Sequence, residues 1–400
     1  MKQIFSFCFF LLIVSSFSAS AQQPGPTPAD SSFKPSGKLW GYTFGDFYYK
    51  AHSDSANRGG ANQYTNVEKG RNAFQFRRVY LGYNYDIHPK FSAELLLAAE
   101  DNVTTRTGAT SGDLLSDNKL SFYIKLANIR WKNVWKGTDL VVGQVSTPAF
   151  ALLVEPIWGY RSIERTITDI RRISSYDLGV ALQGKFDPGT DNFGYDFMVS
   201  NGTGAKPEND KFKWFQGDVY AKFLDKKLVF QLYADYQRQN WNDSFHHARN
   251  MIKGFAAYTT PAFTVGAEAF INHGLNDVVG VTGTKSDTLT ANSVGFSGFV
   301  RGMLVKNKLN FLARADIFNP FTDYKETSYS SYKGLSSTFE PNNKETFVTV
   351  GLDFTPIKNV HFMPNVWYNS YKSQRSTFTG AALKDHDLAY RMTFYYVFGR

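Results

Sequence analysis

Four arginines gather within a short, mildly helical stretch of the first half of the chain. They are Arg161, Arg165, Arg171 and Arg172. A guanidinium group carries a fixed charge and a fork of donors, which suits it to hold an anion such as phosphate. Three acidic residues of the same stretch, Glu155, Glu164 and Asp169, offer the alternative of internal pairing that nearly cancels the charge. The pattern therefore predicts an anion-binding constriction or a self-neutralised loop.

A second set of basic residues lies on the polar faces of strand-like segments. Its main members are Arg78, Lys125, Arg301, Arg314 and Arg391. The same faces carry as many acidic candidates as basic ones. If these faces line a channel, the mixed charge favours a general pore with at most a modest anion preference, because selectivity follows the sign of charged rings.

Other chemistry finds little support in the sequence. The seven histidines are scattered, and His246 and His247 near Asp243 are neighbours whose side chains diverge. No serine or histidine carries a nucleophile signature, and no glycine loop is built to hold phosphate. We therefore predict no enzyme, no metal site and no cofactor.

The elements that position these residues are strands. From residue 38 onward we identify sixteen segments of about 10–14 residues with alternating apolar and polar side chains, the pattern of barrel strands. In the segment 228–240, Leu228, Phe230 and Leu232 share one face, and Gln231 and Asp235 lie on the other. Aromatic residues near segment ends, Trp40, Tyr42 and Trp214 among them, are predicted to form interfacial girdles.

The spacers alternate between very short turns and long polar loops. The long ones are 51–71, 102–117, 147–174, 202–211, 241–248, 275–289, 319–342 and 371–385. This sorting is typical of a membrane barrel, with tight turns on the periplasmic side and long loops outside. Charges in mid-strand then require an aqueous lumen, which a sixteen-stranded barrel is wide enough to hold. The longest loop, 147–174, is also the third and contains the four arginines.

One strand raises a difficulty, because Arg77 and Arg78 are adjacent and should point to opposite faces. The alternation predicts that Arg78 faces the lumen. It places Arg77 on the outer face near the extracellular end, where an arginine costs only about 0–1 kcal/mol.

The ends of the chain and its composition define the remaining regions and exclude some classes of partner. Residues 1–21 read as a signal peptide, 22–37 as a flexible Pro-rich leader and 38–400 as the barrel. The only cysteine, Cys8, lies in the signal, so a disulfide is not expected. The net charge of +9 is scattered and forms no basic helix or patch, which disfavours nucleic acid as a partner.

The chain resembles the phosphate-selective porin O and P family in a series of ordered motifs. These are Phe76-Arg-Arg-Val-Tyr-Leu-Gly82, Val142-Gly-Gln-Val-Ser-Thr-Pro148, Ile163-Glu-Arg165, Asp177-Leu-Gly-Val180 and Val199-Ser-Asn-Gly-Thr-Gly204. The resemblance implies a homotrimeric outer-membrane channel of sixteen strands with an inward-folded third loop. The chain differs from the family in having Ser146 where a lysine is usual, and in ending on Gly399-Arg400 after its last aromatic.

The sequence thus predicts an all-β transmembrane barrel in the outer membrane of a Gram-negative-type bacterium. We expect a porin for passive diffusion of small hydrophilic solutes, anionic or neutral, with a preference for anions such as phosphate. Its partners would be outer-membrane lipid and two further copies of the chain. The alternatives are an outer-membrane receptor or adhesin, and a barrel enzyme with a closed lumen.

Overall fold

The computed structural model describes residues 33–60, 62–100, 115–116, 119–242, 245–325, 328–334 and 340–399. The predicted signal peptide and residues 22–32 of the predicted leader lie outside these ranges, as does most of the loop 102–117. The chain divides into two units, Met1–Pro35 and Ser36–Arg400, and the second contains every barrel strand.

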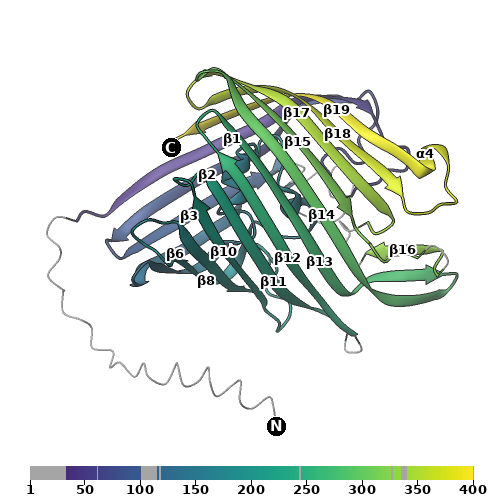
Figure 1. Ribbon diagram of the computed structural model, residues 1–400, viewed down its shortest axis with the longest axis horizontal. Helices are drawn as coiled ribbons and strands as arrows, with labels where there is room; N and C mark the ends of the chain where they lie inside the picture. The colour runs from purple at the N-terminus through teal and green to yellow at the C-terminus, as the bar shows by residue number, and fades with distance from the viewer. Residues whose placement is uncertain are drawn as a thin grey trace, which may run out of the picture. The chain divides into compact units, whose positions relative to one another are not determined.

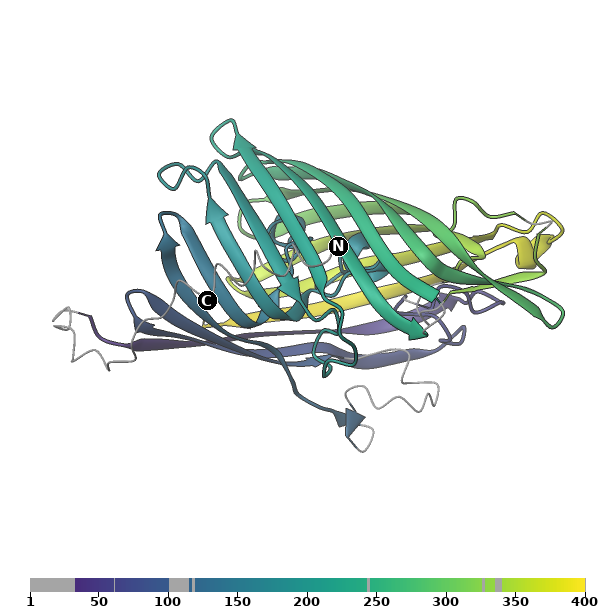
Figure 2. The same ribbon diagram turned by 90° about the horizontal axis from the view of Figure 1, so that it is seen from below.

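Sixteen strands of the second unit form one closed antiparallel barrel (Figures 1 and 2). They are β1 (Ser36–His52), β2 (Asn72–His88), β3 (Phe91–Glu100), β6 (Tyr123–Trp135), β7 (Thr138–Ser146), β8 (Tyr176–Lys185), β9 (Phe193–Ser200), β10 (Trp214–Phe223), β11 (Leu228–Asn242), β12 (Phe245–Thr259), β13 (Phe263–Thr282), β14 (Lys285–Val305), β15 (Leu309–Asn319), β17 (Asn343–Ile357), β18 (Val360–Ser373) and β19 (Lys384–Phe398). Each strand pairs with its neighbours along the chain, and β1 pairs with β19 to close the wall. The predicted sixteen-stranded barrel is confirmed.

A few short elements accompany the wall. They are β4 (Leu115–Ser116), β5 (Lys119–Leu120), β16 (Ser331–Gly334), α2 (Val154–Trp158), α3 (Ile167–Arg171) and α4 (Gly380–Leu383). β16 pairs with β13, while the wall continues directly from β15 to β17. None of the helices found in the described part of the chain has the length and apolar character needed to cross a bilayer.

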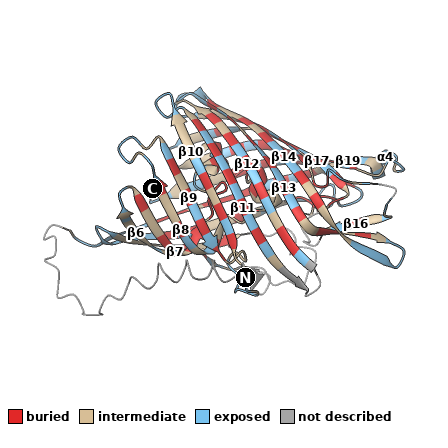
Figure 3. Ribbon diagram, turned by 60° about the horizontal axis from the view of Figure 1, so that its bottom comes forward, coloured by how far each residue is buried: buried red, intermediate tan, exposed pale blue. Residues whose placement is uncertain are grey.

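The two faces of the wall differ as the alternation predicts, and Figure 3 shows buried and exposed residues in alternating bands. In β11, Phe230 and Leu232 are 43% and 57% exposed, whereas Gln231 and Asp235 are buried. Large apolar side chains are therefore presented outward, which suits contact with lipid. Closure pairs the wall strands all round and leaves no open edge in the apolar layer.

The loop predicted over 275–289 is largely strand. β13 and β14 run for 20 and 21 residues and meet at a turn after Thr282. Val278–Val281 pair both with the returning strand β14 and with β16. β-Branched residues in such a run favour a strand whatever lies beyond the membrane, so the polar composition of this stretch was misleading.

The prediction that Arg77 faces outward is wrong. Phe44 of β1 is paired with Arg78 and Gly45 with Phe76, so a bulge in β2 leaves Arg77 without a register partner. The extra residue turns both arginines inward. Arg77 is 7% exposed, and its Nε lies 2.6 Å from Oδ2 of the buried Asp46.

Part of the predicted aromatic girdle also points inward. Trp40 and Trp214 are 7% and 3% exposed, and Tyr42 stacks beside Trp40 along β1. The Trp40 ring fills the space above Gly82 of β2, where an added Cβ would lie 2.3 Å from the indole. An inward ring is favoured here because the glycine on the next strand leaves room for it. Strand alternation alone does not show this.

Candidate functional site

The segment 147–174 joins β7 to β8 and is closed at its base. The Thr147 backbone N–H donates to the Ser175 carbonyl at 3.1 Å, and the Thr147 hydroxyl donates to the Ser174 carbonyl at 2.6 Å. Within it, α2 ends at Gly159, whose φ of 73° is left-handed, and α3 is capped by the Thr166 side chain, which accepts from Asp169 N. The short helices let the segment present distinct apolar and charged sides.

The apolar side of the segment packs against the barrel wall. Ile163 and Ile167 are fully buried, whereas Ile170 is only partly buried. The Trp158 ring contacts Phe299 of β14 with centroids 5.1 Å apart. The cluster also includes wall residues from several other strands: Tyr233, Met251, Phe255, Phe270, Leu312, Phe318 and Met363.

Wall arginines hold the backbone of the segment through its carbonyl oxygens. Arg301 donates to the Ile157 carbonyl at 3.0 Å, and Arg391 donates to the Ile163 carbonyl at 3.1 Å. Arg314 donates to the Arg165 carbonyl at 2.5 Å while also binding Asp316. Three of the five predicted inward basic residues thus bind protein backbone.

Arg77 adds a fourth such contact, which the sequence did not indicate. Its guanidinium donates to the carbonyls of Ser162 and Ile163 and to the side chain of Gln63. The only available signal was the paired arginines in β2, because the bulge that turns Arg77 inward leaves no trace in the alternation.

The four arginines of the segment do not form one cluster. Arg171 makes a two-pronged contact with Glu345 of β17 at 2.9 and 3.0 Å, and Arg172 pairs with Asp235 of β11. Arg161 pairs within the segment, with Glu155 and Asp169, as the alternative interpretation predicted.

Arg165 differs from the other three arginines. Its side chain is 26% exposed, and its nitrogens lie 3.9 Å from the carboxylates of Glu164 and Asp169. The side chains of the other three arginines are only 5%, 7% and 11% exposed. Arg165 is therefore the member of the set best placed to meet a solute.

Glu164 is an ionised group inside this network. Burial alone would raise the pKa of its carboxyl, but Arg165, the indole N–H of Trp367 and Arg391 together outweigh burial and hold the pKa below its usual value. The Trp367 indole donates to this carboxylate at 2.8 Å. The charge of Glu164 thus offsets part of the positive charge of the segment.

The remaining two predicted basic residues form a separate cluster. Arg78 and Lys125 both contact Oε1 of Glu100, at 2.7 and 2.6 Å. Lys125 also donates to the Tyr80 hydroxyl at 2.7 Å. Two cations against one carboxylate leave this part of the inner face with an excess of positive charge.

Two cavities flank the segment. One, of about 360 Å³, is lined by Trp40, Tyr42, Lys125, Glu155 and Arg161 among others. The second, of about 250 Å³, is lined by residues that include Tyr160, Arg301, Asp353 and His361. Each is bounded on one side by the segment and on the other by wall residues, so space for small solutes remains beside it.

The histidine pair behaves as predicted. His247 is buried with Nε2 at 2.9 Å from Oδ1 of Asp277, while His246 is exposed beside the Tyr236 hydroxyl. The two side chains therefore diverge and share no ligand position. Asp243 lies outside the described residues.

Comparison with known proteins finds similarity in structure only. No family model matches the chain, and no curated protein matches its sequence. Among solved structures, the outer-membrane channel DcaP of Acinetobacter baumannii has a TM-score of 0.63 at 11% identity, with 91% of this chain and 97% of that chain covered. OmpF of Salmonella typhi, solved with daunomycin, has a TM-score of 0.57 at 9% identity, with 90% and 97% covered.

A third similar structure is OmpT of Vibrio cholerae, with a TM-score of 0.56 at 10% identity and 92% and 99% of the two chains covered. At such identities the similarity is one of fold. The chain therefore has the barrel fold of outer-membrane channels.

Proposed function

We propose that the protein is an outer-membrane porin that lets small hydrophilic solutes diffuse passively through its barrel. The observation that carries this proposal is the distribution of side chains in a closed barrel, apolar on the outside and charged on the inside. Such an outer face requires lipid around it, and such an inner face requires water or paired charges. The fold shared with outer-membrane channels supports the same location.

The segment 147–174 is the proposed constriction, folded into the lumen as the third loop. Its support is the spread of its partners around the barrel, from Arg77 of β2 through Asp235 of β11 and Arg301 of β14 to Arg391 of β19. A segment outside the barrel could not contact inward residues of strands so far apart in the wall. Solutes would then pass beside it, through the two flanking cavities.

The proposed selectivity is a modest preference for anions such as phosphate. Arg161, Arg171 and Arg172 each have a carboxylate partner, so most of the charge of the segment is compensated. An excess of positive charge rests with the pair Arg78 and Lys125 around Glu100, and Arg165 is the most exposed arginine of the segment. Selectivity set by so few positive charges is weaker than that of a full basic ring.

The proposed partners are outer-membrane lipid and further copies of the chain in a homotrimer. One similar structure, at 11% identity and a TM-score of 0.56, is described as the trimer form of OmpT from Vibrio cholerae. A porin of this kind uses no cofactor and no energy source.

Reconstitution tests the channel directly. Full-length protein, purified in detergent and added to planar lipid bilayers, should produce stepwise current increases that depend linearly on voltage. We expect a conductance large enough to indicate the passage of hydrated ions, because charged residues line the inner face. Negligible conductance would overturn the porin and favour a receptor or adhesin, and labelling by an active-site serine probe would favour an enzyme.

The Arg165→Gln variant tests the anion preference in the same bilayers. We expect the reversal potential in asymmetric salt to shift toward cation selectivity, because Arg165 is the exposed cation of the segment. The matched control removes Arg171 and Glu345 together as Arg171→Gln/Glu345→Gln. This control deletes a compensated pair and should leave the reversal potential unchanged.

Equal shifts in the two variants would contradict the assignment to Arg165. An unchanged preference after replacing Arg161, Arg165, Arg171 and Arg172 together would remove all four arginines from the mechanism.

A further inference from the structure

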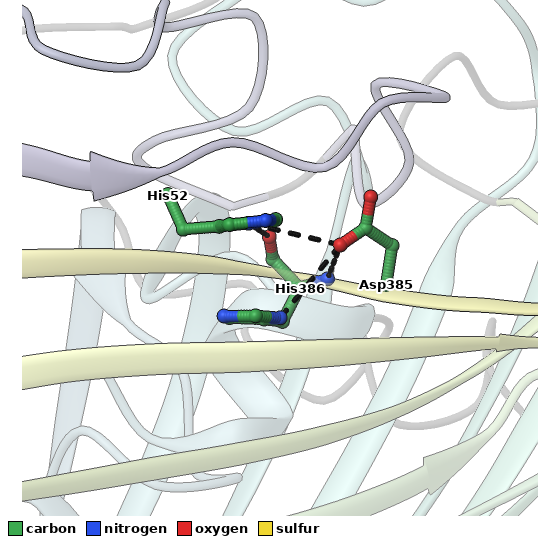
Figure 4. A group of neighbouring side chains, drawn as sticks. All are labelled: His52, Asp385 and His386. Atoms are coloured by element: carbon green, nitrogen blue, oxygen red, sulfur yellow. Dashed lines mark hydrogen bonds and ion pairs between the residues drawn. The ribbon is translucent and has the colours of Figure 1, made fainter. Parts of the chain in front are cut away.

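The first and last strands of the barrel bring together two histidines and an aspartate that the sequence analysis did not connect (Figure 4). His52 is the last residue of β1, and Asp385 and His386 lie at the start of β19. These two strands pair to close the barrel, and His52 belongs to their final register pair, with Leu388. The cluster therefore lies at one end of the seam.

The spacing of the candidate ligand atoms is close to that of a metal site. Nδ1 of His52 and Nδ1 of His386 are each 3.7 Å from the same atom, Oδ1 of Asp385. The imidazole rings are stacked with centroids 4.0 Å apart and planes 9° from parallel. Tetrahedral bonds of about 2.0–2.2 Å place ligand atoms roughly 3.3–3.6 Å apart, so the two N–O distances are within a few tenths of an ångström of that spacing. Because an imidazole nitrogen binds an ion in the plane of its ring, one of the stacked rings would turn when an ion binds.

A hydrogen bond to backbone orients the ring of His52. The backbone carbonyl oxygen of His386 lies 2.8 Å from Nδ1 of His52. In the absence of an ion, Nδ1 of His52 carries the proton and donates to this carbonyl. A bound ion would displace this proton, and water can complete the coordination.

The carboxylate is held in place for this role. Asp385 accepts the backbone N–H of Ser55 on Oδ2 at 2.9 Å and that of His386 on Oδ1 at 2.8 Å. Among the described side chains, its ion-pair partners are the two histidines. The neighbouring Asp54 and Asp387 are paired instead with Arg58 and Lys50. The cluster thus keeps a carboxylate that is oriented by backbone and is not bound by lysine or arginine.

We propose that His52, Asp385 and His386 bind a divalent transition-metal ion of the zinc class. Two imidazole nitrogens and one carboxylate oxygen match the ligand preference of zinc, and not that of calcium or magnesium, which take oxygen ligands. The histidine side chains are 36% and 33% exposed, so an ion can reach them from solvent without unfolding the barrel. A bound ion would link β1 to β19 and reinforce the closure of the wall.

Zinc titration of the full chain tests this site. The protein is purified without a polyhistidine tag, stripped with EDTA and titrated with zinc sulfate by calorimetry in detergent. We expect about one ion per chain. His52→Gln and His386→Gln should each weaken binding by more than the roughly 10–100-fold that loss of an outer-shell partner causes.

His88→Gln is the matched control, because His88 is an exposed histidine at the end of β2 and is not part of the cluster. It should bind zinc as the wild type does. Absorption of bound cobalt gives a second readout, because cobalt in a low-symmetry site has an intense visible band. This band should appear in the wild type and in His88→Gln, and not in His52→Gln or His386→Gln. Heat-modifiable migration in gels verifies that each variant is folded.

The unfolding temperature should rise with zinc in the wild type and not in His386→Gln, because the ion binds only the folded seam. Absence of stoichiometric binding would overturn the proposal, and so would wild-type zinc affinity in folded His52→Gln or His386→Gln. The site is independent of the proposed channel, and its test involves no conductance.

Discussion

Replacing residues 148–173 with a short glycine-serine loop should raise the single-channel conductance at least about twofold, because conductance follows the open cross-section of a pore. The excision is compatible with the wall. Thr147 and Ser175 are already hydrogen-bonded at the base of the segment, so the cut ends are adjacent and β7 and β8 need not move.

The inward side chains that lose partners are polar and would be hydrated in the widened lumen. Arg301, Arg314 and Arg391 lose backbone acceptors, and Glu345 and Asp235 lose arginines. Water replaces these contacts in an open channel, so the barrel should persist at reduced stability. The expected gain in conductance therefore reports the pore and not the loss of the fold.

The matched control shortens the hairpin between β13 and β14 by replacing residues 276–288 with a two-residue turn. This hairpin pairs with β16, whereas the bonds from β13 and β14 to the segment come from Glu268 and Arg301, which the replacement leaves in place. Conductance should stay at the wild-type value. An unchanged conductance in the 148–173 variant, or an equal rise in the control, would show that the segment does not limit the current.

The Arg77→Met variant should lower the free energy of unfolding by about 3–5 kcal/mol, the usual loss when one partner of a buried ion pair is removed. Asp46 is fully buried, and the Arg77 side chain is 8% exposed. Thr393 and Gln75 would still donate to Asp46, but neither supplies a positive charge. The Ser162 carbonyl would lose its donor as well, which loosens the segment.

Unfolding in denaturant, followed by tryptophan fluorescence in lipid vesicles, measures this loss. Arg130→Met is the control, because Arg130 and Asp139 also pair across neighbouring strands at 3.0 Å but are 32% and 28% exposed. An exposed pair contributes about 0–1 kcal/mol. Equal losses in the two variants would contradict the role assigned to burial of Arg77 and Asp46.

The fold was largely predictable from local pattern. Each strand encodes two faces through its alternation, as in Phe230 and Leu232 against Gln231 and Asp235, and this needs no knowledge of distant residues. The sorting of short turns and long loops then sets the antiparallel order. The exceptions were single side chains whose direction depends on a neighbouring strand. Trp40, for example, points inward over Gly82 of β2.

The sequence predicted where the candidate site lies in the chain, but not which residues its side chains contact. The sequence identified the segment 147–174 and its arginines, and it named internal pairing as an alternative, which holds for Arg161. It could not assign Glu345 to Arg171, because these residues are 174 positions apart. It named Arg301, Arg314 and Arg391 as inward residues but could not predict that they bind backbone carbonyls, since a carbonyl is present at every residue and leaves no mark in the sequence.

Composition and periodicity by themselves determined a closed barrel with an apolar outer face, because burial on a strand repeats every second residue. The tertiary structure alone decided which charges meet. The bulge at Arg77 and the meeting of His52 with Asp385 and His386 both depend on register between strands. Register is set by the pairing of whole strands around the barrel, so no stretch of the chain carries it alone.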